Sequence, residues 1–524
     1  MFTLRKAIGL SVLFILLFVS ACAPAAATEP SAATEPYPEY YPAATEAPTE
    51  AAYAPELRQP ASQSPSSNNE PYDMFFEDYG VNPSIDTEDD NLSTFALDVD
   101  TGSYTVMRNY LSEGNLPPPE SVRVEEYVNF FEQGYPYPPE HQAFGIHVDG
   151  GPSPFTQTER YDMLRVGIQG YNVAEEDRKD AALTFVIDVS GSMDMDNRLG
   201  LVKRSLELLV EQLHRSDTVS IVVYGTEARV VLDPTRGSDK GEILSAIYSL
   251  HPEGATNAEA GLHLGYRMAM EAYMPGGINR VILCSDGVAN VGETGPDAIL
   301  EEIRHYVEEG VTLTTIGFGM DNYNDTLMEQ LADNGDGFYA YVDDMDEARR
   351  LFIDEITGTL QTIAMDAKVQ VEFNPEVVMR YRLVGYENRA VADDEFRDNT
   401  VDAGEIGAGH NVTALYEIKL YPEAYGRIAT VFMRWADPDT GQVVEISQDF
   451  DTGQLAYDFR EADPYFQRAV VVAEYAEILK QSYWAEESSL EDVYDEARRI
   501  SRHLDDPDME EFVDLVREAG ALIE

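Results

Sequence analysis

The stretch ALTFVIDVSGS, residues 182–192, decides the fold of this chain. Residues 182–189 form an almost continuous apolar run, which is typical of a parallel strand buried on both faces of a sheet. A strand of this kind that leads directly into an amphipathic helix predicts a strand–loop–helix unit. The helical pattern has apolar residues spaced three and four apart, at Leu199, Val202, Leu206, Leu209 and Leu213.

The same alternation of strand and helix continues on the C-terminal side of this stretch. Alternation of this kind predicts an α/β domain with a doubly wound, mainly parallel sheet and helices on both faces. We expect this domain at residues 180–362. Its further strands are expected at 218–224, 228–232, 280–285, 311–318 and 338–342, and its further helices at 241–250, 258–273, 296–310, 325–332 and from 346 onward.

Oxygen-bearing side chains are concentrated in three loops of this domain. The loops are Asp188-Val189-Ser190-Gly191-Ser192, then Gly254-Ala255-Thr256-Asn257, and then Ser285-Asp286-Gly287. Open α/β sheets bind ligands in the crevice beyond the carboxyl ends of their strands, so the three loops are expected to converge there.

This pattern resembles the metal-ion-dependent adhesion site of von Willebrand factor A (VWA) domains, which consists of Asp-x-Ser-x-Ser, a distant Thr and a distant Asp. The resemblance implies the Rossmann-like VWA fold, in which Ser190, Ser192 and Thr256 bind the metal directly. It further implies that Asp188 and Asp286 hold coordinated waters. Taken singly, Ser-Gly-Ser and Asp-Gly are ordinary turns, so the inference depends on the five residues together.

Oxygen ligands of this kind suit Mg²⁺, with Mn²⁺ or Ca²⁺ as alternatives. Mg²⁺ prefers oxygen and near-octahedral geometry, and it usually keeps several waters. Neutral hydroxyl ligands leave the ion electron-poor with one position open. The resemblance implies that an Asp or Glu carboxylate of a protein partner fills that position.

The segments on either side carry a more particular resemblance. Residues 94–111, 116–119 and 122–131 resemble the N-terminal region of bacterial extracytoplasmic VWA lipoproteins of the YfbK type. Residues 402–410 resemble the signature of that family's C-terminal domain. The resemblance covers roughly residues 90–524. It predicts the arrangement of domains rather than a biochemical activity.

Alternating patterns predict antiparallel strands in both flanks. Because a VWA domain starts and ends at the edge opposite its metal loops, both flanks are expected to form one β-sandwich into which the domain is inserted. We expect an N-terminal domain at 72–175 and a C-terminal domain at 365–524, in which helices follow the strands. The strands are expected at 144–148, 163–169, 368–373, 377–384, 412–420, 428–435 and 442–446, and the helices at 464–483, 490–503 and 507–523.

Two smaller features receive structural interpretations. The segment Asp98-x-Asp100-Thr101-x-Ser103 is expected to be a strand-to-helix turn, in which Thr101 or Ser103 caps a helix that runs through Leu111. A second metal site there is the alternative, but no distant Thr and Asp partners are evident. His410 stands alone after a glycine-rich turn and is expected to be structural.

The N-terminus has the pattern of an export signal. Arg5 and Lys6 precede the uncharged stretch 7–21, and Val19-Ser20-Ala21-Cys22 resembles the bacterial lipobox. We therefore expect a lipoprotein signal peptide at 1–21, with lipidation of Cys22. An ordinary signal peptide or an anchor helix is the alternative. The chain would then be extracytoplasmic and lipid-anchored to a bacterial membrane, at the cell surface or in the periplasm.

Residues 22–71 are rich in Pro, Ala, Thr and Glu and contain one basic residue, Arg58. Proline at this density blocks helix and sheet, and few apolar side chains are available to offset the entropy of ordering. This segment is expected to be a disordered tether between the membrane and the folded part of the chain.

Composition excludes some function classes. The chain has 36 Lys and Arg residues against 96 Asp and Glu residues, a formal net charge of −60. Nucleic acid is therefore excluded as the main partner, because phosphate binding depends on clustered basic residues. The sequence contains no His-Glu-x-x-His, P-loop or Gly-x-Ser-x-Gly motif, so we do not expect an enzyme.

Two functions remain open. The first is a membrane-anchored protein that binds a protein partner through a Mg²⁺-dependent adhesion site. The second is a structural cell-envelope protein whose metal site only rigidifies loops.

Overall fold

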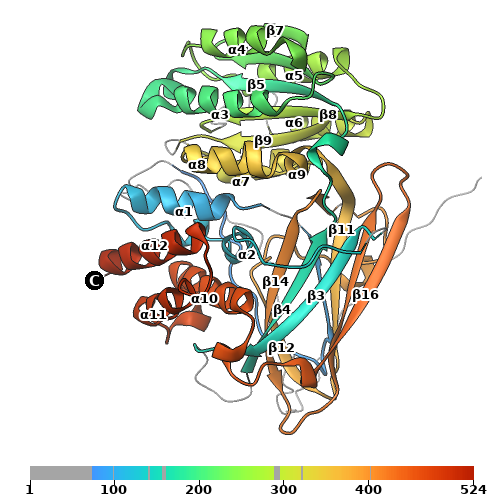
Figure 1. Ribbon diagram of the computed structural model, residues 1–524, viewed down its shortest axis with the longest axis vertical. Helices are drawn as coiled ribbons and strands as arrows, with labels where there is room; N and C mark the ends of the chain where they lie inside the picture. Colours follow the sequence, from blue (N-terminus) through green and yellow to red (C-terminus); the bar gives the residue numbers. More distant parts are fainter. Residues whose placement is uncertain are drawn as a thin grey trace, which may run out of the picture. The chain divides into compact units, whose positions relative to one another are not determined.

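A six-stranded sheet forms the centre of the inserted domain (Figure 1). The computed structural model describes residues 74–97, 100–139, 142–155, 161–287, 296–319, 323–401 and 403–523. The strand order is β10-β9-β8-β5-β6-β7, and the pairs are parallel except that β7 runs antiparallel to β6. The strands are β5 (Ala181–Asp188), β6 (Thr218–Tyr224), β7 (Ala228–Arg236), β8 (Ile278–Ser285), β9 (Thr312–Gly317) and β10 (Tyr339–Tyr341).

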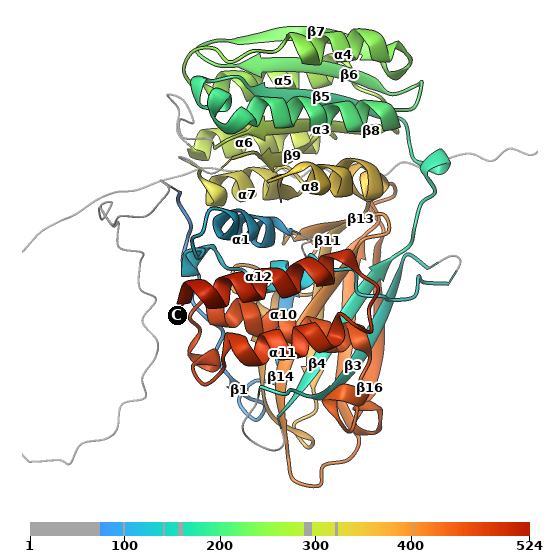
Figure 2. The same ribbon diagram turned by 60° about the vertical axis from the view of Figure 1, so that its left-hand side comes forward.

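Helices cover both faces of this sheet, which confirms the doubly wound fold (Figure 2). Leu183, Phe185 and Ile187 of β5 pack on one face and Val186 packs on the other, as expected of a strand buried on both sides. The first face is covered by α3 (Arg198–Gln212), α4 (Lys240–Ser249), α8 (Met345–Arg349), a π-helical segment (Arg350–Asp354) and α9 (Ile356–Leu360). The second face is covered by α5 (Ala258–Glu271), α6 (Pro296–Glu308) and α7 (Asp325–Asp333).

The flanking strands form two antiparallel sheets with a shared apolar core. Strands from both sides of the inserted domain pair in each sheet: β4 pairs with β14, and β2 pairs with β11. This confirms the predicted insertion into a sandwich. The first sheet has the strand order β1 (Ile85–Asp86), β12 (Val378–Val384), β14 (Asn411–Leu420), β4 (Tyr161–Gly170), β3 (Phe144–Pro152). The second sheet has the strand order β13 (Gly404–Gly407), β11 (Thr362–Phe373), β15 (Arg427–Ala436), β16 (Val443–Asp451), and β2 (Leu92–Ala96) also pairs with β11.

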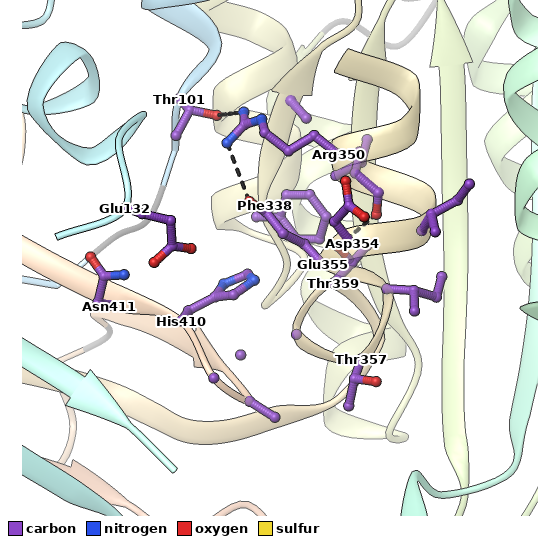
Figure 3. Close-up of a pocket in the computed structure, with 18 of the residues that line it drawn as sticks. Thr101, Glu132, Phe338, Arg350, Asp354, Glu355, Thr357, Thr359, His410 and Asn411 are labelled. Carbon is purple, nitrogen blue, oxygen red and sulfur yellow. Dashed lines mark hydrogen bonds and ion pairs between the residues drawn. The ribbon is translucent and has the colours of Figure 1, made fainter. Parts of the chain in front are cut away.

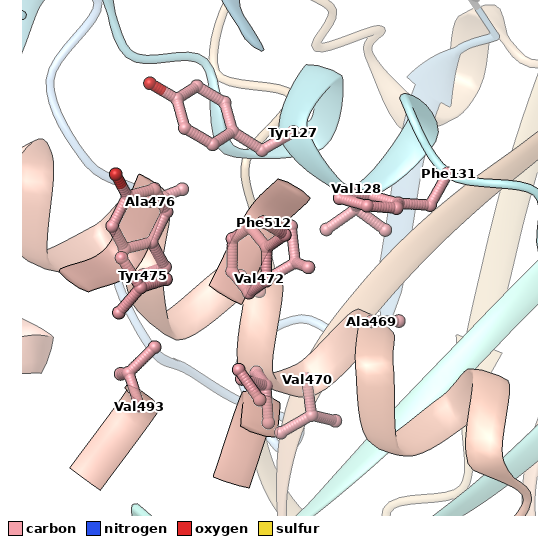
Figure 4. Close-up of a cluster of buried hydrophobic side chains, with 14 of the residues drawn as sticks. Tyr127, Val128, Phe131, Ala469, Val470, Val472, Tyr475, Ala476, Val493 and Phe512 are labelled. Atoms are coloured by element: carbon pink, nitrogen blue, oxygen red, sulfur yellow. The ribbon is translucent and has the colours of Figure 1, made fainter. Parts of the chain in front are cut away.

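Helices from the two ends of the described chain share one apolar core (Figure 4). Phe512 lies edge-on to Tyr475 at a ring-centroid distance of 5.2 Å and edge-on to Phe131 at 5.7 Å. Edge-to-face pairs of this kind add to the free energy gained from burial. The N-terminal and C-terminal segments are therefore held together by helix packing as well as by the sandwich. The helices are α1 (Gly102–Ser112), α2 (Val124–Asn129), α10 (Pro464–Leu479), α11 (Leu490–Ile500) and α12 (Pro507–Ile523).

The start of α1 differs from the prediction. Thr101 is the N-cap residue, but its side chain does not cap the helix. Its hydroxyl oxygen instead accepts a hydrogen bond from Arg350 at 3.2 Å, and the Ser103 hydroxyl donates to the Ser121 carbonyl. The Glu126 carboxylate accepts the free Ser103 N–H at 2.7 Å, so a residue distant in sequence replaces the local cap.

The helix expected at 464–483 ends earlier, at Leu479. Gln481 has a φ of +56°, a left-handed conformation that a helix cannot continue through. The Ser482 N–H then bonds back to the Glu477 carbonyl at 3.0 Å, which satisfies one of the last helical carbonyls.

The predicted signal peptide, the lipidation site Cys22 and the predicted tether lie outside the described residues. Among the residues that are described, no helix is both long and apolar enough to cross a bilayer.

Candidate metal centre

Asp188 is the last residue of β5 and is fully buried. Its carboxylate accepts hydrogen bonds from the Ser190 N–H at 2.7 Å and from the Ser285 hydroxyl at 3.2 Å. Burial raises the pKa of Asp188 to about 6, and the hydrogen bonds from Ser190 and Ser285 act against this shift. The side chain is thus held in one orientation at the carboxyl edge of the sheet.

Ser190 and Ser192 place their hydroxyl oxygens 2.9 Å apart. Two adjacent ligands of an octahedral ion with bonds of about 2.0–2.1 Å are separated by about 2.9 Å, so the pair fits neighbouring positions on Mg²⁺. Ser192 lies in a short 3₁₀ helix, Gly191–Asn197, that follows Ser190.

The second loop is hydrogen-bonded to the first. The Gly191 N–H donates to the Gly254 carbonyl at 3.2 Å, and the Thr226 hydroxyl oxygen accepts from the Ala255 N–H at 3.0 Å. Thr256 follows directly and is partly buried, just before the N-cap residue Asn257 of α5. The backbone therefore brings the Thr256 loop beside the Ser190 loop.

Asp286 follows β8 and is almost completely buried. Its carboxylate accepts a hydrogen bond from Arg198 at 2.9 Å. Burial raises the pKa of Asp286, while hydrogen bonds from Ser192 and Arg198 act to lower it. The Ser192 contact joins Asp286 to the Ser190–Ser192 pair, so residues of the first and third loops form one bonded group.

The donor set fits a hard divalent cation. Three hydroxyls and two carboxylates, all oxygen donors, are carried by loops at one edge of the sheet: Asp188, Ser190, Ser192, Thr256 and Asp286. With such an ion bound, the site would offer a Lewis-acidic position to an oxygen ligand. Hydrogen bonds from Ser190 and Ser285 orient the Asp188 carboxylate, and the bond from Arg198 orients Asp286. The hydroxyls of Ser190 and Ser192 lie side by side.

Sequence reasoning did not predict the supporting roles of three residues of this site, although Ser285 was part of the third loop. Ser285 supports Asp188, Thr226 supports the second loop, and Arg198 is bonded to Asp286. Arg198 is the first basic residue after the Asp-x-Ser-x-Ser loop, a signal that the pattern of ligands alone did not include.

Two other clusters of carboxylate or imidazole groups occur among the described residues. One consists of Asp180, His214 and Asp217, and the other of Asp100, Glu126 and Glu329. Asp217 is bonded to Arg178 at 2.7 Å. In the second cluster Glu126 pairs with Arg123, and both Asp100 and Glu329 pair with Arg389. Carboxylates of both clusters already form ion pairs with arginine side chains of the chain. Neither cluster is therefore assigned a metal.

A cleft of about 850 Å³ lies between the last helices of the inserted domain and the flanks (Figure 3). Glu132, His410 and Asn411 line it on the side of the flanks, and Arg350 lines it on the side of the domain. Arg350 is bonded to Thr101 and pairs with Glu347 of α8 and with Glu355, which follows its own helical segment. Burial lowers the pKa of His410. Its Nε2 atom is buried without a hydrogen-bond partner among the described residues, and the structural interpretation of His410 stays a prediction.

Comparisons with known proteins match most of the chain. A family model for the von Willebrand factor type A domain matches residues 182–354. A von Willebrand factor model matches 70–163, and the model of the C-terminal part of uncharacterized protein YfbK matches 358–522. Uncharacterized protein YfbK of Escherichia coli K12 is 41% identical over 352 residues, which cover 66% of this chain and 61% of that protein. The chain belongs to the YfbK-type VWA proteins.

Other proteins are similar to parts of the chain. The inter-alpha-trypsin inhibitor heavy chain H3 of Pongo abelii is 25% identical over 259 residues, 45% of this chain and 29% of that protein. The solved von Willebrand factor type A structure from Catenulispora acidiphila has a TM-score of 0.45 and 16% identity, and the match covers 74% of this chain and 91% of that one. VWA domains typically bind a divalent metal, and they commonly serve protein–protein interaction or adhesion. For this YfbK-type chain the domain points to that class of function.

Proposed function

We propose that this YfbK-type protein captures a protein partner through a divalent cation, Mg²⁺ in the first instance, bound at its VWA domain. The observation that carries the proposal is the serine pair, whose hydroxyl oxygens stand 2.9 Å apart beside two buried carboxylates. The proposed ligands are Asp188, Ser190, Ser192, Thr256 and Asp286. The partner offers an Asp or Glu carboxylate to the open position, and no catalytic role is proposed.

The acidity of the chain restricts how such a partner is reached. A net charge of −60 repels an acidic protein at long range. Screening at physiological salt acts over about 8 Å, so only a carboxylate brought close to the cation is attracted. Capture is therefore expected to be selective for short-range fit rather than driven by electrostatic steering.

Removal of divalent metal is expected to abolish capture. Immobilised protein, residues 22–524 without the lipid, would be mixed with envelope extract in excess Mg²⁺ or in EDTA. The expected result is a partner retained only with Mg²⁺ and released by EDTA, with calorimetry showing Mg²⁺ binding to the protein alone. If EDTA lowers the melting temperature but leaves the same partner bound, the metal only rigidifies loops and the structural alternative holds.

We also propose that the protein is held at a bacterial membrane, outside the cytoplasm, by a lipid on Cys22. The basic start, the apolar stretch 7–21 and the Val19-Ser20-Ala21-Cys22 sequence support this proposal. The segment 22–71 would then act as a tether that lets the folded part stand away from the membrane.

Cys22→Ser is expected to move the protein out of the membrane fraction or to block its processing, because a serine cannot carry the thioether-linked lipid. Fractionation and gel mobility of the two proteins measure this. Cys284→Ser is the control, because the second cysteine of the chain is buried and far from the N-terminal segment in sequence. A Cys22→Ser protein that fractionates and migrates like the parent would refute the lipid anchor.

A further inference from the structure

We propose that Arg198 is a positioning residue of the candidate metal centre, which fixes Asp286, and that the N-terminal flank completes the pocket in which Arg198 lies. This inference rests on the proposed metal-binding function. It adds a residue outside the ligand pattern and connects the site to a helix outside the VWA domain.

Arg198 reaches the site from the first residue of α3. Its guanidinium donates to a carboxylate oxygen of Asp286 at 2.9 Å, and both side chains are only 4% exposed. A buried carboxylate with a guanidinium on one oxygen loses freedom to rotate, because rotation would leave a buried charge unpaired. The orientation of Asp286 toward Ser192 therefore depends on Arg198.

Gly319 makes room for this arginine. A Cβ atom at Gly319 would lie 2.3 Å from Nε and 2.5 Å from Cδ of Arg198, distances that real side chains do not tolerate. Gly319 also has a φ of +95°, a conformation that favours glycine. The loop after β9 is thus shaped to admit the arginine stem.

Tyr341 of β10 lies beside Gly319. Burial raises the pKa of Tyr341, while its hydrogen bond from Asn109, the charge of Arg198 and the Gly319 N–H act to lower it. The Gly319 backbone thus lies between the two side chains, with its N–H bonded to the Tyr341 hydroxyl and the Arg198 stem packed against its Cα. The contact joins the arginine pocket to the end of the last strand of the sheet.

The N-terminal flank reaches Tyr341 through α1. The Asn109 side-chain amide donates to the Tyr341 hydroxyl at 2.9 Å, and the Thr105 hydroxyl donates to the Tyr341 carbonyl at 2.9 Å. A continuous set of contacts therefore runs from Asn109 through Tyr341, Gly319 and Arg198 to Asp286. We infer that α1 contributes to the metal affinity of a domain to which it does not belong.

Calorimetry with MgCl₂ tests this inference on the full-length folded protein. Arg198→Gln is expected to weaken Mg²⁺ binding by about tenfold or more, as for other residues that orient metal ligands. Arg198→Lys keeps the charge without the planar fork and should restore part of the affinity. Arg178→Gln is the matched control, because Arg178 and Asp217 form a pair of similar burial, 2.7 Å long, before β5 and β6 at the opposite edge of the sheet.

The flank is tested by Asn109→Ala. This variant should weaken Mg²⁺ binding by about two- to fivefold. In the Arg198→Gln background it should cause no further loss, because the two residues act through the same carboxylate. Equal losses in both backgrounds would show that Asn109 acts on the site by another route and would overturn the contact chain.

The possible failures are distinguishable. A parent protein that binds no Mg²⁺ refutes the proposed function and this inference together. If the parent binds Mg²⁺ and Arg198→Gln binds it equally well, only the role of Arg198 is refuted. If Arg178→Gln weakens binding as much as Arg198→Gln, the effect reflects general loss of stability, and melting temperatures of all variants would follow the same order.

Discussion

Asp188→Ala is expected to weaken the affinity for Mg²⁺ at least about 100-fold. This is the upper end of the loss caused by removing a group that orients metal ligands. The substitution removes the acceptor of the Ser190 N–H and of the Ser285 hydroxyl, so two loops lose their common support. Partner capture should be lost with the metal. Calorimetry with MgCl₂ and the Mg²⁺-dependent capture assay measure both effects.

The fold itself should survive this substitution. Asp188 lies at the end of a strand whose other residues are apolar and buried, and burial already opposes its charged form by raising its pKa to about 6. Circular dichroism should therefore match that of the parent. Asp194→Ala is the control, because it removes an exposed carboxylate from the same loop. Unchanged Mg²⁺ binding in Asp188→Ala would eliminate the site assignment, and global unfolding would favour a structural role.

The sequence is informative about the fold where one physical signal dominates. The apolar run at β5 and the three- and four-residue spacing of α3 are local, so they predict buried elements without knowledge of their neighbours. The insertion of the domain into a sandwich was predictable because its ends were expected at one edge. The strand β2, which pairs with β11, was not predicted from the sequence.

Other features depend on residues distant in sequence. The start of α1 is satisfied by Glu126 rather than by Thr101, because the carboxylate reaches Ser103 from another helix. The pattern of ligand residues predicted the loops of the metal centre, but not Arg198, which acts on Asp286 across the site. A single sequence gives the donor types and their spacing, whereas ion pairs between distant segments require the packing itself.

Arg123→Met is expected to lower the free energy of unfolding by about 3–5 kcal/mol, because it leaves buried carboxylates without their cation. Arg123 precedes α2 in the N-terminal flank and bonds to Asp325 of α7 at 2.7 Å. It also pairs with Glu126 and lies 3.8 Å from Glu329. All four side chains are at most 6% exposed. Methionine keeps most of the apolar stem, so the change isolates the charge.

The nearby Arg389 does not compensate for the loss of the Arg123 guanidinium. Arg389, in the segment between β12 and β13, bonds to Glu329 at 2.7 Å and to Asp100 at 3.1 Å, and it already serves those carboxylates. Arg123 is therefore the cation that joins α2 to the first turn of α7. Its removal should weaken the contact between the flank and the VWA domain more than any exposed pair could.

The loss should be larger at pH 8 than at pH 5. Burial raises the pKa of Glu126 to about 7 even though Arg123 acts against the shift, so its removal should raise that pKa further. A carboxyl group whose pKa is higher in the folded than in the unfolded state stabilises the fold at low pH, and this stability is lost as pH rises through the folded value. The variant therefore recovers stability in acid, where the cluster takes up protons.

Urea denaturation of parent and variant at both pH values measures the difference. Arg349→Met is the control: it removes an ion pair with Asp346 on α8 whose side chains are 54% and 85% exposed, and it should change stability by less than about 0.5 kcal/mol. A loss in Arg123→Met no larger than in this control, or one that does not shrink at pH 5, would mean that the buried carboxylates of the cluster do not depend on Arg123. In that case the flank would be held to the VWA domain by apolar packing of α1 against β10 and by the Arg108–Asp343 pair, 2.7 Å long, instead.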